Sequence, residues 1–588
     1  MSDAWERTGR LTAQGYILCL LVLLCPLVYS FRVMSFLHAK EAVLWVGVIG
    51  LSALYMRRGV SLGSVAVWLP FWVILGFGMV FHVLLGNARV PSDATVSAAK
   101  GFVVVSVGVF AREVFQSPGW RRRVSGCVGL SAVLVAILGI CQYLGYLKLL
   151  FPQFTENSAR MYSVFGNADL LGGYLAMAMP FLAAPFFSSE PSPDRRYEAV
   201  WFGMSLFPVI LALGLSGSRG AWLAGSAGLL VLVSFRDFSW KRLTLFLVIG
   251  GVAMGVAFGL AGGVLRERIL EMVQVQGVGV RARLWFWDGA VRMIRDHLIA
   301  GVGLGNFAYW SPRYLGEALA APNGAAHYHN DVHTLYAHSD ILQWTAETGL
   351  IGLLAIVWFL IRLPYRRTPE MGALAALGVF SLFHFPFHSA PHALLGVLCA
   401  TGLFAEDTTG AEQSIPVFRV GKALERLFAP AAVFIACFLL WAVFWQSVLL
   451  KAADTQYLSK ASDTLDAYRR VCAHPWRNAL AQRNFAIALI AAGHYAEAEA
   501  EIREALDGLD TGQLYLALGA LAELRGSTEE AREYLREAVF RIPSNLEVWR
   551  RLLRLSSPGE LASLKGEARR YLSEEAYRTL ETFDSPSP

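Results

Sequence analysis

Charged residues are scarce in this 588-residue chain, and apolar residues are abundant. Asp, Glu, Lys and Arg make up 16% of the sequence, hydrophobic residues make up 55%, and the mean hydropathy is +0.46. Soluble globular domains carry about 25% charged residues, so the composition excludes a chain built only of soluble domains. The net charge of +6 comes mostly from short arginine-bearing loops. It therefore indicates membrane topology, and no nucleic-acid partner is expected.

Cysteine is nearly absent from the polar parts of the chain. Six of the seven cysteines lie in apolar stretches, and only Cys472 lies in a polar region. This pattern excludes a framework of disulfide bonds. No small-residue cleavage site follows the first apolar stretch, so we expect no cleaved signal peptide.

The apolar residues are gathered into long stretches. A helix needs about 20 apolar residues to cross a bilayer, and thirteen stretches reach or approach that length. They lie near residues 15–33, 40–56, 64–86, 97–112, 124–147, 168–187, 199–215, 219–235, 243–264, 341–361, 371–387, 391–404 and 429–450. The sequence therefore predicts an all-α, polytopic helical membrane protein with about 12–14 spans.

The basic residues of the short loops predict the orientation of these spans. With the N-terminus in the cytoplasm, six alternate loops carry Arg or Lys, and the loops between them carry almost none. Cytoplasmic loops hold the excess of Lys and Arg, so the long loop 265–340 is expected outside. We predict N-terminal transmembrane helices over 1–264, C-terminal transmembrane helices over 341–450, and a soluble domain over 451–588. Thirteen spans would place that domain outside as well.

A sequence repeat with a period of 33 residues appears in the soluble domain. The matched pairs are Gly493 with Gly526, Ala498 with Ala531, Ile502 with Leu535, and Ala505 with Ala538, and Pro543 closes the second copy. Small residues at fixed positions let paired helices pack closely, and this pattern resembles the tetratricopeptide repeat. We predict a short α-solenoid over roughly residues 463–580. It would be either a structural cap or a platform for a protein partner or for the acceptor.

The long loop contains a predicted helix and a glycine-rich segment. Trp285, Ala290, Met293 and Ile294 form an apolar stripe, which predicts an amphipathic helix over about 283–296. The segment GVGLGNF follows it, with glycines spaced G-x-G-x-G. A dinucleotide fingerprint needs G-x-G-x-x-G between a strand and a helix. Here a helix precedes the glycines, so we reject a dinucleotide site.

Histidine is concentrated in one region, because seven of the twelve histidines lie between residues 327 and 392. One interpretation is a metal site with suitable ligand types. Its residues would be His327, His329, Asp331 and His333. However, these residues follow a stretch rich in Gly and Ala, where closely spaced histidines are often only solvated. We therefore disfavour a metal ion.

A second interpretation is general-base catalysis by His338. This histidine begins the segment AHSDILQWTAETGLIG, at the foot of a predicted span, with Asp340 and Glu347 close behind it. A neutral imidazole can take a proton from an attacking hydroxyl near pH 7. Taken alone, the position also suits an ordinary residue of the membrane interface.

Five arginines on the predicted outer side favour the catalytic interpretation of His338. Arg219 lies in a short turn between two apolar stretches, and Arg281 and Arg283 begin the amphipathic helix. Arg160 and Arg313 lie on the same side. Positive charge is disfavoured there, so topology does not explain these residues. Guanidinium groups match phosphate oxygens, so the pattern indicates a phosphate-bearing lipid substrate.

Five segments between about residues 160 and 400 resemble the O-antigen ligase and O-antigen polymerase family. They are SVFGNADLLGGYLAMAMPF (163–181), SGSRGAWL (216–223), RLWFWDGAVRMIRDHLIAGVGLGNF (283–307), AHSDILQWTAETGLIGLL (337–354) and HFPFHSAPHALL (384–395). That family consists of glycosyltransferases of the bacterial inner membrane that use glycans linked to undecaprenyl diphosphate. The order of the segments, with one large outer loop before the last spans, makes the resemblance specific.

The resemblance implies roles for three residues. His338 matches the family's catalytic histidine, and Arg219 and Arg283 match its diphosphate-binding arginines. The accessory candidates are Arg160, Arg281, Arg313, His329, Asp340 and Glu347. The segment HYHND at 327–331 offers a second His-Asn-Asp, but the spacing to Gln343 and Glu347 favours His338. In the family's Asn-Pro-Asn turn this chain has Asn-Ala-Asp, at 167–169.

The resemblance also implies a reaction. An acceptor hydroxyl attacks the anomeric carbon of the lipid-linked sugar, undecaprenyl diphosphate leaves, and the configuration inverts. The acceptor is lipid A core in a ligase, a growing glycan in a polymerase, and a protein in an O-oligosaccharyltransferase. We prefer the ligase. A transporter is less favoured because the membrane half shows no clear internal repeat, and an envelope-assembly scaffold does not explain His338 and the arginines.

Glu347 is expected to have a separate role. At 1.5 Å per residue it lies about 13 Å from His338 along the helix, so it is too far away to orient the imidazole directly. Asp340 is only two residues on and points elsewhere on the helix. We expect Glu347 to contact a neighbouring span.

The first prediction concerns metal. Because arginine supplies the positive charge, transfer should survive chelation by EDTA, and no cofactor should be needed. The measurement is the transfer rate in purified proteoliposomes before and after chelation. Loss of transfer that zinc or magnesium restores would instead support the site at His327, His329, Asp331 and His333.

Overall fold

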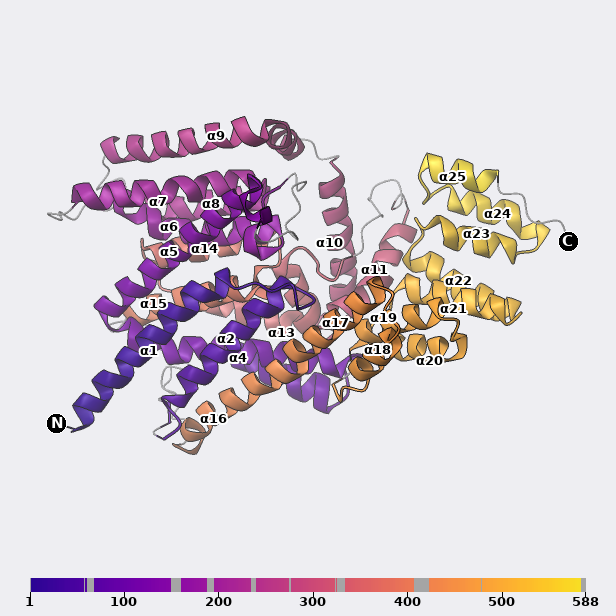
Figure 1. The fold of residues 1–588 in the computed structure, drawn as a ribbon, viewed down its shortest axis with the longest axis horizontal. Helices are drawn as coiled ribbons and strands as arrows, with labels where there is room; N and C mark the ends of the chain where they lie inside the picture. The colour runs from indigo at the N-terminus through magenta and orange to yellow at the C-terminus, as the bar shows by residue number, and fades with distance from the viewer. Residues whose placement is uncertain are drawn as a thin grey trace. The chain divides into compact units, whose positions relative to one another are not determined.

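The structure is a computed structural model that describes residues 2–57, 59–60, 68–149, 160–187, 195–233, 240–273, 277–322, 324, 334–406, 422–476 and 478–582. These residues are almost all helical, and they contain no β-strand (Figure 1). The all-α prediction is confirmed. The chain divides into two compact units. Unit 1 contains residues 1–75, 99–274 and 354–447, and unit 2 contains residues 76–98, 275–353 and 448–588.

Long apolar helices make up most of unit 1. They are α1 (Ser2–Leu27), α2 (Phe36–Ala53), α3 (Leu69–Phe77), α4 (Pro91–Phe115), α5 (Pro118–Tyr143), α6 (Ala168–Phe187), α7 (Arg195–Leu215), α8 (Arg219–Leu232), α9 (Trp240–Val273), α14 (Pro369–Ser381), α15 (Ala390–Glu406) and α16 (Lys422–Leu439). Four helices have residues in both units. They are α3, α4, α13 (Asp340–Arg362) and α17 (Gln446–Leu458).

All thirteen predicted apolar stretches overlap helices. Eight helical segments of the described chain are long and apolar enough to cross a membrane. They are Thr8–Leu27, Phe36–Ala53, Pro91–Phe115, Pro118–Tyr143, Ala168–Phe186, Leu243–Leu270, Asp340–Arg362 and Lys422–Leu458. The other five stretches fall on described helical segments that do not meet both criteria. The chain is therefore a multi-pass membrane protein.

Small residues let α6, α8 and α14 pack at close range in unit 1. A Cβ atom on Gly228 of α8 would lie 2.7 Å from the carbonyl oxygen of Gly372 of α14. A Cβ atom on Gly172 of α6 would lie 2.8 Å from the Cβ of Ala221 in α8. Helices in lipid associate through such close backbone contacts. This packing fixes the start of α8, where Arg219 lies.

The outer loop predicted from the sequence is folded into helices in unit 2. The amphipathic helix is confirmed as α10 (Val278–Asp296), and α11 (Phe307–Ala320) packs against it. The indole Nε1 of Trp285 donates a hydrogen bond to the carbonyl of Leu315, at 2.9 Å. The hydroxyl of Tyr314 donates to Oδ2 of Asp296, at 3.1 Å. Burial and the nearby Asp296 raise the pKa of Tyr314, so the hydroxyl keeps the proton that it donates.

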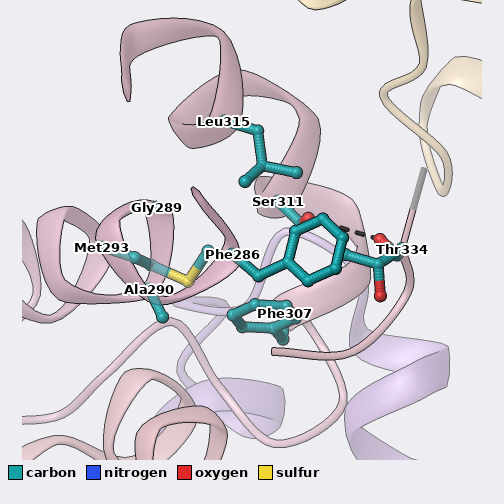
Figure 2. Close-up of a pocket in the computed structure, with 8 residues that line it drawn as sticks. All are labelled: Phe286, Gly289, Ala290, Met293, Phe307, Ser311, Leu315 and Thr334. Carbon is teal, nitrogen blue, oxygen red and sulfur yellow. Dashed lines mark hydrogen bonds between the residues drawn. The ribbon is translucent and has the colours of Figure 1, made fainter. Parts of the chain in front are cut away.

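A small apolar recess, too narrow to hold a water molecule, lies between α10 and α11. Figure 2 shows Phe286, Met293 and Phe307 converging on it, with Leu315 on the opposite wall. Ser311 donates to the carbonyl of Thr334 at its edge, at 3.4 Å. The lining offers no charged group, so the recess cannot hold phosphate. It marks where α10, α11 and the segment before α13 pack together.

The predicted solenoid is confirmed in the C-terminal part of unit 2. Its helices are α18 (Thr464–Cys472), α19 (Ala479–Ala491), α20 (Tyr495–Leu506), α21 (Gly512–Leu524), α22 (Thr528–Arg541), α23 (Leu546–Arg554), α24 (Pro558–Ala568) and α25 (Glu574–Glu581). Gly493 and Gly526 adopt positive φ, at 81° and 77°, in the matching turns between paired helices. Glycine adopts this conformation without steric cost. The repeated alanines that the sequence singled out are fully buried.

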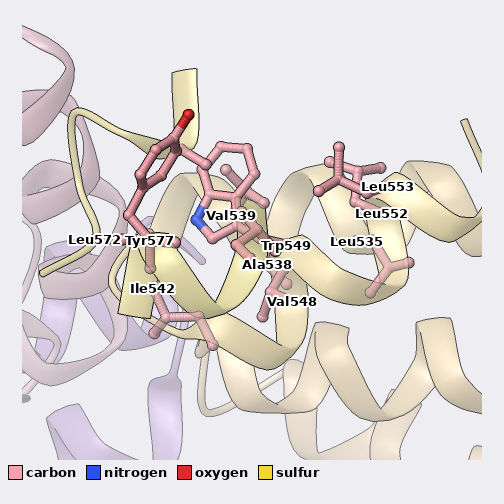
Figure 3. Close-up of a cluster of buried hydrophobic side chains, with 12 residues drawn as sticks. Leu535, Ala538, Val539, Ile542, Val548, Trp549, Leu552, Leu553, Leu572 and Tyr577 are labelled. Atoms are coloured by element: carbon pink, nitrogen blue, oxygen red, sulfur yellow. The ribbon is translucent and has the colours of Figure 1, made fainter. Parts of the chain in front are cut away.

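The last helices of the solenoid share one hydrophobic core. Trp549 of α23 is fully buried among side chains of α22 and α25, including Ile542 and Tyr577 (Figure 3). Its indole donates to the carbonyl of Pro543, at 2.7 Å, directly after α22 ends. Proline was expected to close the repeat, and here its carbonyl also anchors the next helix.

The solenoid packs on α11 within unit 2. Gly316 of α11 faces the carbonyl of Phe540 in α22 so closely that a Cβ atom there would overlap it. Tyr571 packs against the α10 and α11 core cluster that contains Trp285. Arg89, next to the start of α4, lies 3.6 Å from Asp507 and donates to Tyr309 of α11. The repeat domain and the folded outer loop therefore form one compact body.

Candidate functional site

His338 is held in an unusual backbone conformation immediately before α13. Its φ is +51°, in the left-handed region that glycine normally occupies. For a residue with a side chain this conformation costs of order 1–3 kcal/mol, and such strain clusters at functional sites. The half-buried imidazole stacks on the ring of Phe286 in α10, with ring centres 5.5 Å apart and planes 24° apart. Both the backbone and the ring of His338 are thus fixed.

Arg283 lies one helical turn before Phe286 on α10. Residues three apart share a helix face, so Arg283 lies on the face of α10 that meets His338. Arg283 and the ring on which His338 stacks therefore lie one helical turn apart on α10. Arg281 is half-buried in the first turn of α10 and lies on another face. Arg313 of α11 is exposed, and it pairs with Glu317 on its own helix at 3.4 Å.

Glu347 is buried and contacts the outer loop. Its Oε2 accepts a hydrogen bond from the backbone N–H of Gly305, at 2.9 Å. Its Oε1 accepts from Nε2 of Gln343, at 3.1 Å. Gly305 belongs to the glycine-rich segment and Gln343 to α13 itself, and the expectation that Glu347 contacts a neighbouring span stays a prediction. Asp340 is also buried, and it lies in the first turn of α13, where a carboxylate suits the helix dipole.

Helix α13 is interrupted at Gly349, whose φ of 63° and ψ of −157° are not helical. This region is open essentially only to glycine. The glycine loop, residues 298–306, lies against the interruption. Gly303 donates to the carbonyl of Glu347 at 2.9 Å, and Leu350 donates to the carbonyl of Leu298 at 2.8 Å. These bonds give the freed backbone groups of α13 new partners.

The glycine loop explains the GVGLGNF segment. Gly301, Gly303 and Gly305 all have positive φ, at 70°, 99° and 72°. A Cβ atom on Gly301 would overlap the backbone of Glu347. One on Gly305 would overlap the hydroxyl of Ser97. The glycines are required for close backbone approach, which agrees with the rejection of a dinucleotide site.

Arg219 begins α8 in unit 1, directly after the turn Ser216–Ser218. Both serines of that turn are fully buried, and Gly217 between them has φ +59°. Arg160 donates from Nε to the carbonyl of Ser216, at 2.8 Å. Arg160 and Arg219 therefore flank one turn. A helix N-terminus with adjacent guanidinium groups favours an anion.

Asp169 and His384 support Arg160. The guanidinium of Arg160 binds both carboxylate oxygens of Asp169, at 2.7 and 3.5 Å. Nε2 of His384 lies 3.8 Å from Oδ1 of Asp169. Asn167 accepts from the backbone N–H of Asp169 at 2.8 Å, so it caps the start of α6. The Asn-Ala-Asp turn thus has a defined structural role.

Sequence reasoning missed Asp169, His384 and a further arginine, Arg268 of α9. A Cβ atom on Gly217 would lie 3.8 Å from Cγ of Arg268 and 3.5 Å from Nε of Arg160. Arg268 lies in the last part of α9, beyond a break at Ala261, whose φ of −136° and ψ of 27° are not helical. The segment HFPFHSAPHALL was the available signal for His384.

Two comparisons with known families match this chain. A family model described as O-Antigen ligase matches residues 204–357, and one described as Tetratricopeptide repeat matches residues 512–555. The chain is similar to the O-antigen ligases. A comparison with curated proteins found no match. The family match supports a membrane glycosyltransferase of the O-antigen ligase or polymerase type, acting on a glycan or lipid-linked substrate, with a repeat domain of a kind that serves protein interaction.

The O-antigen ligase match covers Arg219, Arg283 and His338 and ends before His384. Unit 1 contains Arg160 and Arg219, and unit 2 contains Arg281, Arg283, Arg313, His338, Asp340 and Glu347. The proposed metal ligands His327, His329, Asp331 and His333 lie outside the described residues. Among the residues that the structure does describe, no group of three His, Cys, Asp or Glu side chains is arranged to hold a metal ion.

The second prediction tests the interruption of α13. Gly349→Ala should destabilise the protein, because the new Cβ would overlap the carbonyl of Ile299. The measurement is the temperature at which half of the detergent-purified protein aggregates, which should fall. Strain of this kind costs about 2 kcal/mol or more. The control is Gly378→Ala in α14, where a Cβ meets nothing within 4 Å. Its effect should be small or stabilising, since alanine favours helix. If both variants aggregate at the same temperature, the conformation of Gly349 does not require glycine.

Proposed function

We propose that this protein is an inner-membrane glycosyltransferase that transfers a glycan from undecaprenyl diphosphate to an acceptor hydroxyl on the periplasmic side. The preferred acceptor is lipid A core, which makes it an O-antigen ligase. The observation that carries the proposal is the placement of His338. The imidazole is fixed at the start of a candidate span and stacked on α10 one turn from Arg283, inside the region that matches the O-antigen ligase model.

In the proposed reaction, His338 accepts the proton of the acceptor hydroxyl as the oxygen attacks the anomeric carbon. The bond between that carbon and the phosphate oxygen breaks, and undecaprenyl diphosphate leaves with the bonding electron pair. Attack opposite to the leaving group inverts the anomeric centre. Arg283 and Arg219 stabilise the charge that develops on the phosphate oxygens, since preorganised cations are most effective in a partly dehydrated site. No metal or cofactor is required.

The depth of His338 suits a lipid-linked donor. The diphosphate of a polyprenyl lipid lies at the membrane interface, because its tail is in the bilayer. His338 directly precedes Asp340–Arg362, which is apolar enough to cross a membrane. A base at the first turn of such a helix is held at the level of the diphosphate by the span itself.

A protein acceptor is the second candidate, and one observation favours it. The solenoid packs on α11 in the same compact unit that carries His338. Tetratricopeptide repeats form extended surfaces that bind partners, so the solenoid could deliver a protein hydroxyl. The protein would then be an O-oligosaccharyltransferase. A growing glycan as acceptor would make it a polymerase.

Deleting the gene and separating the envelope glycans on a gel tests the proposed acceptor. A ligase leaves lipid A core without polymer, beside accumulated lipid-linked polymer. Products limited to a single repeat would indicate a polymerase. Unchanged lipopolysaccharide together with proteins that have lost their glycans would indicate the protein acceptor.

The third prediction concerns the base. His338→Ala should lower turnover by about 100-fold or more, the scale of a lost general base, while the protein remains in the membrane. His329→Ala should have a mild effect. Both are measured as transfer from purified lipid-linked donor in proteoliposomes. If His329→Ala abolishes transfer and His338→Ala is tolerated, the catalytic histidine lies in the HYHND segment.

The fourth prediction concerns the arginines. Arg283→Lys and Arg219→Lys should each lower turnover by about 10-fold or more, because a point charge cannot replace the two-pronged contact of a guanidinium with phosphate. Arg292→Lys is the matched control on α10, where the guanidinium pairs with Asp288 at 3.1 Å. Turnover of this control should resemble that of the parent. Parent-like turnover in both test variants would remove arginine from the proposed mechanism.

A further inference from the structure

Two polar side chains, Gln343 and Glu347, are buried in the first turns of α13. Gln343 is 2% exposed and Glu347 is 4% exposed. Burying an amide and a carboxylate is unfavourable unless hydrogen bonds compensate. Apolar residues of similar size would cost less at these positions if packing were their only task. The hydrogen bonds that these two residues make indicate another task.

The bonds form a continuous chain that ends next to His338. The backbone N–H of Gly305 donates to Oε2 of Glu347, at 2.9 Å. Nε2 of Gln343 donates to Oε1 of Glu347, and Oε1 of Gln343 accepts from the backbone N–H of Ala337, both at 3.1 Å. Ala337 is fully buried and immediately precedes the histidine.

The hydrogen bonds of this chain can run in only one direction, which the donor and acceptor groups determine. An ionised carboxylate only accepts hydrogen bonds, whereas an amide has one donor end and one acceptor end. Glu347 therefore turns the NH₂ of Gln343 toward itself. This leaves the amide oxygen of Gln343 facing the N–H of Ala337. Residues four apart lie on the same helix face, which is why this pair can form within α13.

We infer that Gln343 and Glu347 are positioning residues that hold His338 in its left-handed conformation and keep its ring on Phe286. The inference rests on the proposed role of His338 as the base. Gln343 fixes the backbone directly before the histidine, and Glu347 fixes the orientation of Gln343. The glycine loop, through Gly305, anchors the far end of the chain. Neither side chain takes the proton of the acceptor.

Exchanging the side chains of Gln343 and Glu347 tests this chain of hydrogen bonds. In Glu347→Gln an NH₂ group replaces one carboxylate oxygen and faces either the N–H of Gly305 or the NH₂ of Gln343, so one of these donors loses its acceptor. In Gln343→Glu two carboxylates face one another, and one of them must take up a proton. Each single variant should lower kcat by about 10- to 100-fold, the scale of a displaced catalytic group, with the KM for the lipid-linked donor unchanged.

The exchanged double variant Gln343→Glu with Glu347→Gln should recover kcat to within about threefold of the parent. The glutamate at 343 accepts from Ala337 and from the new amide at 347, whose oxygen accepts from Gly305. Thr345→Val is the matched control, because its buried hydroxyl donates to Ile341 within α13 and has no link to this chain. This control should keep the parent's kcat.

Two readouts separate positioning from simple support of the fold. In the His338→Ala background, Glu347→Gln should cause no further loss of turnover, because residues that act through one group are not additive. Amide exchange of the full protein in detergent should accelerate over residues 334–342 in Glu347→Gln but not in Thr345→Val. Equal losses in both backgrounds, or no recovery in the double variant, would overturn the inference. Parent-like turnover of His338→Ala would overturn the proposed base instead, and amide exchange would still test the positioning.

Discussion

The backbone contact between the glycine loop and the interruption of α13 is the constraint on which the His338 side of the protein depends. At Gly349 the helix loses its regular hydrogen bonds, and Leu298 and Gly303 pair with the freed groups. The same contact brings the N–H of Gly305 to Glu347. A side chain at Gly301 or Gly349 would separate the two backbones. The packing of α10 and the position of His338 therefore follow from a few glycines.

The architecture could be predicted because it depends on local patterns. Apolar stretches of span length identified the membrane helices, and the period of 33 residues identified the solenoid, whose repeated glycines adopt positive φ. Contacts between the elements could not be predicted in this way. Gly316 against Phe540 joins segments more than two hundred residues apart, and nothing in the local composition of either segment indicates the other.

In the candidate site, too, the residue types could be predicted from the sequence, whereas their contacts could not. Arg219 and Arg283 were recognisable because positive charge is disfavoured on the predicted outer side, and His338 because it matches the family's catalytic histidine. Their supporting residues were not. Asp169 has no unusual local setting, and only the fold brings it to Arg160 and His384. Glu347 was expected to contact another span, and its hydrogen bond to Gly305 of the glycine loop was not foreseen.

The interruption of α13 also explains how one helix can serve two purposes. Its beginning, through Leu353, packs in unit 2 with α10 and the glycine loop, and its remainder from Leu354 belongs to unit 1. A continuous helix would couple the orientation of His338 to the tilt of the span in the bilayer. The break at Gly349 allows contacts with Gly305 and Phe286 to orient the first turns of α13. The apolar remainder of the helix keeps the regular hydrogen bonds that a membrane-spanning helix needs. His338 is thus positioned by contacts within unit 2, ahead of the apolar part of α13.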